Sequence, residues 1–133
     1  MKSSTFHIIN AAAGSGKTYA LVYAYLFRLL SSSREDTYKN MLALTFTNKA
    51  VNEMKFRILN NLYQLAYEID GDKIKNIRSS LIIDLKTDPP LLEQKAKRVL
   101  NKILHEYAAF EVITLDSFTH KIIKSFAKDL RIP

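Results

Sequence analysis

Apolar residues along the chain alternate between short continuous runs and stripes in which they recur every three or four positions. A short run is typical of a strand buried in a parallel sheet, and a stripe is typical of a helix with one buried side. Strand, helix and strand in succession form a βαβ unit, so the pattern predicts an α/β fold. We expect strands around residues 6–10, 41–46 and 110–115, and helices around 16–30, 51–65 and 118–130. Thr47 or Asn48 is the expected N-cap of the second helix, and Asp116-Ser117 that of the last.

The segment between residues 68 and 109 departs from this rhythm. A break at Asp70-Gly71-Asp72 and the pair Pro89-Pro90 bound two amphipathic stretches, which predict helices at 74–85 and 91–107. We interpret this segment as a helical insertion. The chain then divides into a βαβ part at residues 1–67, the insertion at 68–109, and a third strand with a basic helix at 110–133.

The loop after the first predicted strand reads AAAGSGKT and occupies residues 11–18. A strand, a glycine-bearing loop ending in Gly-Lys-Thr and a helix form the layout of a phosphate-binding loop, because backbone N–H groups and a helix N-terminus converge there. Glycine lets the backbone approach the ligand, the lysine reaches the β- and γ-phosphates, and the threonine hydroxyl suits Mg²⁺. The alternative is a chance Gly-Lys-Thr, since the strict pattern has glycine where Ala11 stands. The predicted site consists of Ala11, Ala12, Ala13, Gly14, Ser15, Gly16, Lys17 and Thr18, with Lys17 and Thr18 as the catalytic pair and Thr18 as the Mg²⁺ ligand.

Composition narrows the classes of function. The chain has 133 residues, enough for one domain, and no cysteine, which excludes disulfides and thiolate metal sites. No apolar run approaches the ~18 residues of a membrane span, so we expect no membrane partner and a cytoplasmic location. The formal net charge of +7 favours an anionic partner such as nucleic acid, although solubility alone would also explain it.

Two further segments follow the carboxyl ends of predicted strands, where open α/β sheets bind their ligands. Residues 45–50 read TFTNKA and residues 114–118 read TLDSF, so each combines polar side chains with one aromatic ring. That mixture suits single-stranded nucleic acid, although Phe46 and Phe118 could instead be core residues. On the last helix, a basic stripe at helical spacing could face DNA or only solvent; it consists of Lys121, Lys124, Lys128 and Arg131.

Three motifs together resemble a known family. AAAGSGKT is similar to motif I of the UvrD/Rep class of superfamily 1 DNA helicases. Residues 44–58 (LTFTNKAVNEMKFRI) are similar to motif Ia of that class, and residues 114–126 (TLDSFTHKIIKSF) are similar to motif Ib. Within the class, the sequence is closer to the RecB/AddA helicase–nuclease branch. The resemblance implies a RecA-like P-loop NTPase domain with three layers, the first motor domain, 1A, using ATP and Mg²⁺. Tyr19 stands where many relatives have arginine and could stack on the base. The DNA contacts that the resemblance implies are Phe46, Thr47, Asn48, Lys49, Thr114, Ser117, Phe118 and Lys121.

These expectations concern a protein longer than this chain. No strand after the loop ends in Asp-Glu, which would supply the carboxylates that hydrolysis needs. We therefore expect an N-terminal piece of an ATP-dependent DNA helicase, with a possible nuclease, whose partners are single-stranded or duplex DNA and the remaining domains of its own chain. The piece alone is expected to lack ATPase activity. Two alternatives are a P-loop kinase for a nucleoside or small molecule, and a non-enzymatic basic DNA-binding module.

Overall fold

The computed structural model describes residues 15–131, with side chains from residue 18 onward. This part is mostly helical and contains a small parallel sheet of two strands, an arrangement compatible with an α/β helicase domain. The first predicted strand, at residues 6–10, and the loop up to residue 14 lie outside the described residues. The elements are α1 (Ser15–Ser31), η1 (Thr37–Asn40), β1 (Leu42–Thr45), α2 (Asn48–Ala66), α3 (Asp72–Leu85), α4 (Pro89–His105), η2 (Tyr107–Ala109), β2 (Glu111–Thr114) and α5 (Leu115–Asp129).

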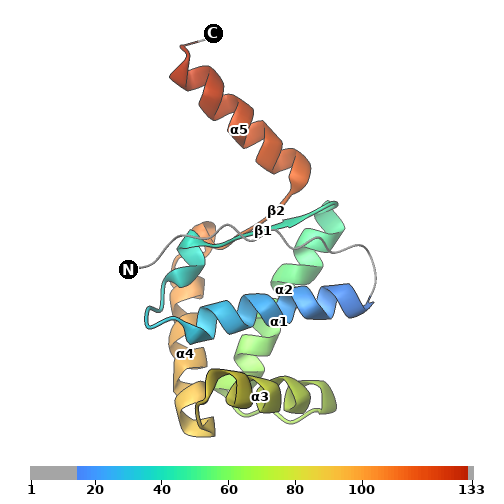
Figure 1. Cartoon of the computed structure of the whole chain (residues 1–133), viewed down its shortest axis with the longest axis vertical. Coiled ribbons are helices and arrows are strands. Elements are labelled where there is room, and N and C mark those ends of the chain that lie inside the picture. The colour runs from blue at the N-terminus through green and yellow to red at the C-terminus, as the bar shows by residue number, and fades with distance from the viewer. Residues whose placement is uncertain (1–14, 132–133) are drawn as a thin grey trace.

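Helices α1 to α4 enclose the core, because each has an apolar stripe at helical spacing. Among the helix pairs, α2 and α4 make the most extensive contact; α1 packs against both of them, and α3 packs against α1 and α2. Figure 1 shows these four helices on one side of the strands. Of the stripe predicted on α2, Val51 is partly buried, and the rest is buried and packs against a buried stripe on α4: Met54, Ile58, Leu62 and Leu65. The largest fully buried side chains of the core include Leu26, Leu29, Tyr38, Met54, Ile58, Leu62, Leu81, Ile103 and Phe110.

The two described strands pair in parallel, as the sequence predicts for residues 41–46 and 110–115. The register aligns Leu42 with Glu111 and, at the other end, Thr45 with Thr114. Parallel strands need a crossover connection, and here α2, α3 and α4 together provide it. The segment predicted as an insertion, 68–109, contributes α3 and α4 to the same core as α1 and α2. The division of the chain into three parts stays a prediction.

Side chains cap the helices that follow the strands. Thr47 is the N-cap of α2, as expected, and its hydroxyl oxygen accepts a hydrogen bond from the Ala50 N–H at 3.0 Å. The prediction that Asp116 and Ser117 cap the last helix was wrong. Thr114 is the N-cap, with its hydroxyl oxygen accepting from the Ser117 N–H at 3.1 Å, so Asp116 and Ser117 lie in the first turn. The strand therefore passes into the helix without a loop, because one threonine ends β2 and caps α5.

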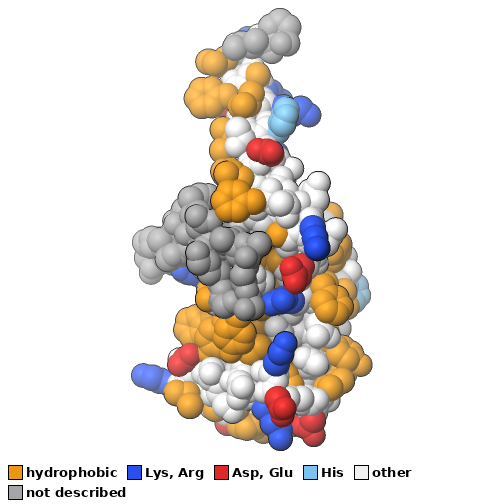
Figure 2. Space-filling view, turned by 90° about the vertical axis from the view of Figure 1, so that its right-hand side faces the viewer, with side chains coloured by type: hydrophobic (Ala, Val, Ile, Leu, Met, Phe, Trp, Pro, Cys, Tyr) orange, Lys and Arg blue, Asp and Glu red, His pale blue; other side chains and the backbone are white. Residues whose placement is uncertain are grey.

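Helix α5 extends away from the rest of the described structure (Figure 1) and buries none of its residues. Figure 2 shows apolar side chains along one of its sides and basic side chains along the other. The predicted apolar side is therefore present but uncovered within the described residues: Phe126, for example, is 64% exposed. The helix depends on its cap and on its junction with the sheet, rather than on a core of its own.

Two buried tyrosines of the core differ in how their hydroxyls are satisfied. The Tyr38 hydroxyl donates to the Lys102 carbonyl oxygen at 3.0 Å. Within the described part of the chain, the buried Tyr25 hydroxyl has no hydrogen-bond partner. Burial, with a smaller contribution from Tyr38, raises the pKa of Tyr25. Tyr25 packs edge-on against Phe110, so its ring contributes to the core while its hydroxyl costs free energy.

We expect Tyr25→Phe to raise the free energy of unfolding by about 1 kcal/mol, because it removes a buried polar group without a partner. The matched variant Tyr38→Phe loses a hydrogen bond and is expected to lower it by about 1 kcal/mol. Urea denaturation of the two variants and the unsubstituted chain measures both changes. A Tyr25→Phe variant less stable than the unsubstituted chain would contradict the assignment of an unsatisfied hydroxyl.

Removing the cap of α5 is expected to destabilise this helix selectively. Thr114→Ala should lower the free energy of unfolding by about 1 kcal/mol, since the first turn loses its acceptor, whereas Thr114→Ser keeps the hydroxyl and should stay close to the unsubstituted chain. The control is Ser125→Ala, at an exposed position of the same helix, with an expected change within about 0.5 kcal/mol. Circular dichroism during chemical denaturation provides the measurement, and equal effects at both positions would argue against the cap.

Candidate functional site

The parallel register brings two of the predicted DNA-contacting segments to the same edge of the sheet. Thr45 and Thr114 are the last residues of their strands and are partners in the ladder. Residues 46–49 and 115–118, which follow directly, therefore start from neighbouring points of the backbone. In Figure 1 both strands run toward the side on which α1 begins. The carboxyl edge of the sheet is the structural basis of the candidate site.

The segment after β1 presents the side chains that a nucleic acid could reach. Phe46 is 60% exposed, which excludes the alternative that it belongs to the core of the described structure. Asn48 and Lys49 are exposed in the first turn of α2, and that turn contains no acidic residue. Thr47 is exposed as well, although its hydroxyl oxygen is engaged as the cap. The N-terminus of α2 thus combines an exposed ring, an amide and an ammonium with the positive end of a helix dipole.

The side chains of the segment after β2 are less accessible to a ligand than those of the segment after β1. Thr114 is buried, and its hydroxyl donates to the Ser117 Oγ at 3.0 Å while it caps α5. The Phe118 side chain is half-buried, so it is not a core residue, and its ring is only partly accessible to a ligand. The Lys121 Nζ donates to a carboxylate oxygen of Glu111 and forms an ion pair with it. Together with the exposed carboxylate of Asp116 in the first turn, these contacts make this segment a weaker anion site than the start of α2.

The phosphate-binding segment lies only partly within the described residues. Residues 11–14 lie outside them, and Ser15 to Thr18 form the first turn of α1, which contains no acidic residue. Tyr19 is exposed and its ring stacks on that of Tyr23, with centroids 6.5 Å apart and planes 10° from parallel. The Tyr23 hydroxyl donates to the Asp84 Oδ2 at 2.6 Å, and burial together with this hydrogen bond raises the pKa of Tyr23. Tyr19 is thus held on a ring fixed to α3.

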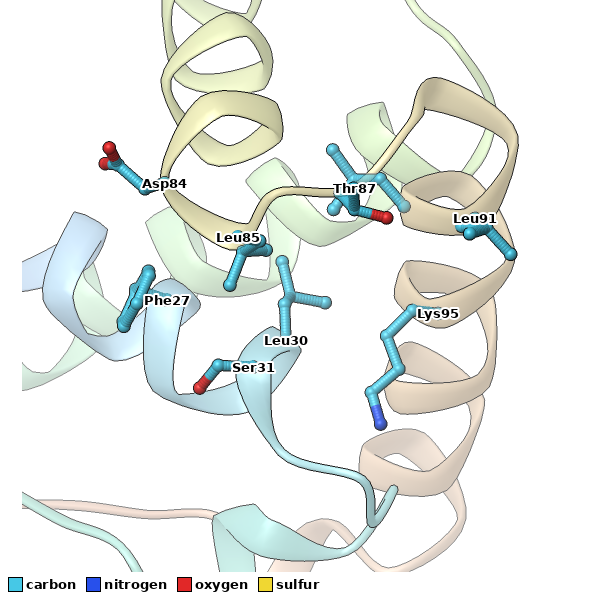
Figure 3. Close-up of a pocket in the computed structure, with 9 residues that line it drawn as sticks. Phe27, Leu30, Ser31, Asp84, Leu85, Thr87, Leu91 and Lys95 are labelled. Carbon is cyan, nitrogen blue, oxygen red and sulfur yellow. The ribbon is translucent and has the colours of Figure 1, made fainter.

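The described residues contain a cavity of about 290 Å³, at the far end of α1 from this segment. Figure 3 shows its lining between the ends of α1 and α3 and the start of α4. The Lys95 ammonium, at its edge, donates to the Arg34 carbonyl oxygen at 2.9 Å, and burial lowers the pKa of Lys95. None of the predicted site residues lines this cavity, whose lining is Phe27, Leu30, Ser31, Asp84, Leu85, Thr87, Leu91, Leu92 and Lys95.

Within residues 15–131, no group of three or more His, Asp and Glu side chains could hold a metal ion. In the same part, no helix is both long and apolar enough to span a membrane.

Sequence reasoning assigned no role to three exposed aromatic residues of α2: Phe56, Tyr63 and Tyr67. They lie on the side of the helix opposite to its buried stripe, and the tyrosine rings contact each other with centroids 5.0 Å apart. Their spacing of seven and four residues from one to the next was a visible signal of a shared face. Only the structure reveals that this face is uncovered within the described residues.

Comparisons with known proteins show the family of the chain. The family profile described as "UvrD/REP helicase N-terminal domain" matches residues 2–132. The chain is 30% identical over 126 residues to an ATP-dependent helicase/nuclease subunit from Streptococcus uberis, covering 95% of this chain and 8% of the relative. It is 34% identical over 110 residues to the RecB subunit of the RecBCD enzyme from Chlamydia trachomatis, covering 80% of this chain and 10% of the relative.

A third relative is the probable DNA helicase II homolog of Mycoplasma genitalium, 29% identical over 129 residues, covering 83% of this chain and 18% of the relative. The chain thus spans about a tenth of the length of the first two relatives. No solved structure gives a significant match. Because the family profile covers nearly the whole sequence, the chain belongs to the UvrD/REP helicase N-terminal domain family.

Proposed function

We propose that the chain is the N-terminal ATP-binding and single-stranded-DNA-contacting part of an ATP-dependent DNA helicase. Its fold in this proposal is a RecA-like P-loop domain, with residues 1–67 and 110–133 forming the motor and residues 68–109 inserted into it. The observation that carries the proposal is the register of β1 and β2, which brings the segments after Thr45 and Thr114 to one sheet edge. Ligands of open α/β sheets bind at such an edge.

The nucleotide site of the proposal comprises residues 11–19. Its support is the start of α1 at Ser15: a helix of 17 residues begins inside the glycine-bearing loop, and its first turn has no acidic residue. A helix N-terminus of this kind favours a phosphate group. In the proposal, Lys17 holds the β- and γ-phosphates and Tyr19 stacks on the base. The Thr18 hydroxyl supplies one oxygen to Mg²⁺, which neutralises phosphate charge when bound.

The DNA contact of the proposal is strongest at the start of α2. Phe46 would stack on a base, while Asn48 and Lys49 would meet the backbone phosphates beside the positive end of α2. Residues 114–118 and Lys121 would form a second, weaker contact, because Lys121 is paired with Glu111 and Asp116 adds a negative charge. The two contacts hold one strand across the sheet edge, so that nucleotide binding at α1 and DNA binding share the same sheet.

The whole protein of which this chain would be a part is proposed to couple ATP hydrolysis to DNA unwinding. The name of the Streptococcus uberis relative includes a nuclease, which adds that activity to those proposed for the whole protein. The chain itself lacks an acidic pair after either described strand: β1 is followed by Phe46 and β2 by Leu115. The residues that position the attacking water are therefore proposed to come from other parts of the protein.

Lys17→Ala is expected to weaken ATP binding by about 10- to 100-fold, the loss of one charge-assisted hydrogen bond of about 1.5–3 kcal/mol. Binding of single-stranded DNA should stay unchanged. Titration with a fluorescent ATP analogue and anisotropy of a labelled oligothymidylate measure the two affinities. The exposed Lys73 of α3 gives the matched control, Lys73→Ala. Unchanged ATP affinity in Lys17→Ala would contradict the nucleotide site.

We expect the isolated chain to release no phosphate from ATP above the rate of its Lys17→Ala variant, with or without single-stranded DNA. The reason is the missing pair of carboxylates, without which Mg²⁺ and water are not positioned for attack. A phosphate-release assay at saturating DNA provides the measurement. Release that DNA stimulates and that Lys17→Ala abolishes would reveal a catalytic carboxylate within the chain.

A further inference from the structure

One face of α2 continues from the candidate DNA contact toward the far end of the helix. Its residues follow one another at spacings of three or four, so they form a single stripe, and all of them are exposed. We call this set the α2 stripe: Lys49, Asn52, Phe56, Asn60, Tyr63 and Tyr67. It begins in the predicted contact at Lys49 and ends at the residue that closes α2.

The chemistry of the α2 stripe is unusual for an exposed helix face, since it alternates rings with amides and contains no carboxylate. Phe56 is 66% exposed. The exposed Glu53 borders this face, four residues after Lys49 and three before Phe56, and its Oε2 is paired with the Arg57 guanidinium at 3.0 Å. At the far end, the Lys97 ammonium of α4 lies 5.1 Å from the centre of the Tyr67 ring. The surface thus offers rings, hydrogen-bond donors and positive charge together.

We propose that the α2 stripe is a stacking platform for single-stranded DNA, which extends the contact at Phe46 and Lys49 along the helix. This inference rests on the proposed function. From Lys49 to Tyr67 the helix rises about 27 Å, at about 1.5 Å per residue. Bases stack on exposed rings regardless of sequence, while amides and ammonium groups meet the phosphates. The strand therefore runs from the sheet edge along α2 to Lys97.

The apolar side of α5 provides the contrast that favours DNA over a protein partner on α2. That side consists of Leu115, Ile122, Ile123, Phe126 and Leu130, all exposed. It is mostly aliphatic, so it offers little for a base to stack on. The α2 stripe has rings and amides in place of aliphatic side chains, and it adjoins the start of α2, which lacks acidic residues. Its composition matches a nucleic-acid surface.

The test compares ring removal on the two helices. Phe56→Ala and Tyr63→Ala should each weaken binding of an oligothymidylate of about 16 nucleotides, by about 5- to 100-fold for a ring that stacks on a base. Phe126→Ala removes an equally exposed ring from α5 and should bind the DNA as the unsubstituted chain does. Affinity measured at several salt concentrations separates stacking from charge: the ring variants should keep the salt slope, whereas Lys49→Ala should reduce it by about 1.

A second measurement needs no substitution. An oligonucleotide carrying 5-bromodeoxyuridine should crosslink on irradiation to the tryptic peptide of residues 58–73, which contains Tyr63 and Tyr67. Crosslinks in this peptide support the platform, and their absence overturns it. DNA affinity unchanged in both ring variants also overturns it, assigns the α2 stripe to a protein partner and leaves the proposed function standing. If the unsubstituted chain binds no oligonucleotide, the proposed DNA contact fails together with this inference.

Discussion

The parallel pairing of β1 with β2 is the constraint on which the rest of the described structure depends. Parallel strands cannot be joined by a tight turn, so the chain leaves the sheet at Thr45, at one edge, and must return to Glu111 at the opposite edge, beside Leu42. Helices α2, α3 and α4 form this crossover connection, and their apolar stripes are buried in one core with that of α1. The pairing therefore produces both the helical core and the sheet edge at which two polar segments meet.

At that edge, structural and binding roles compete for the same side chains. Thr47 and Thr114 each follow or end a strand, and each uses its hydroxyl to cap the next helix. A hydroxyl that satisfies a helix N-terminus is less available to a phosphate. The side chains available to a ligand are those that do not cap a helix, above all Phe46 and Lys49. The start of α2 is the stronger of the two candidate contacts because its first turn has no acidic residue, whereas in the other segment Lys121 is paired with Glu111 and Asp116 adds a negative charge.

The two exposed faces of the described structure differ in what they can bind. Helix α5 presents aliphatic side chains that only another apolar surface would cover, whereas α2 presents rings interleaved with amides. Both helices start at the same sheet edge, one from each strand. The two kinds of surface therefore diverge from one edge of the sheet.

The sequence by itself determined the elements, because helical and strand periodicities are local properties. The limits of α1, α2, α3 and α4 differ from the expected ones by only a few residues, and the resemblance carried by the three motifs is confirmed by the family profile. Only the tertiary structure decided which surfaces are covered. Phe46 and Ile58 are both apolar in the sequence, yet one is exposed and the other fully buried. Burial depends on which distant segments pack together, and periodicity within one helix cannot specify its partner. For the same reason the ion pair of Lys121 with Glu111 and the uncovered rings of α2 emerged only when the strands had been paired.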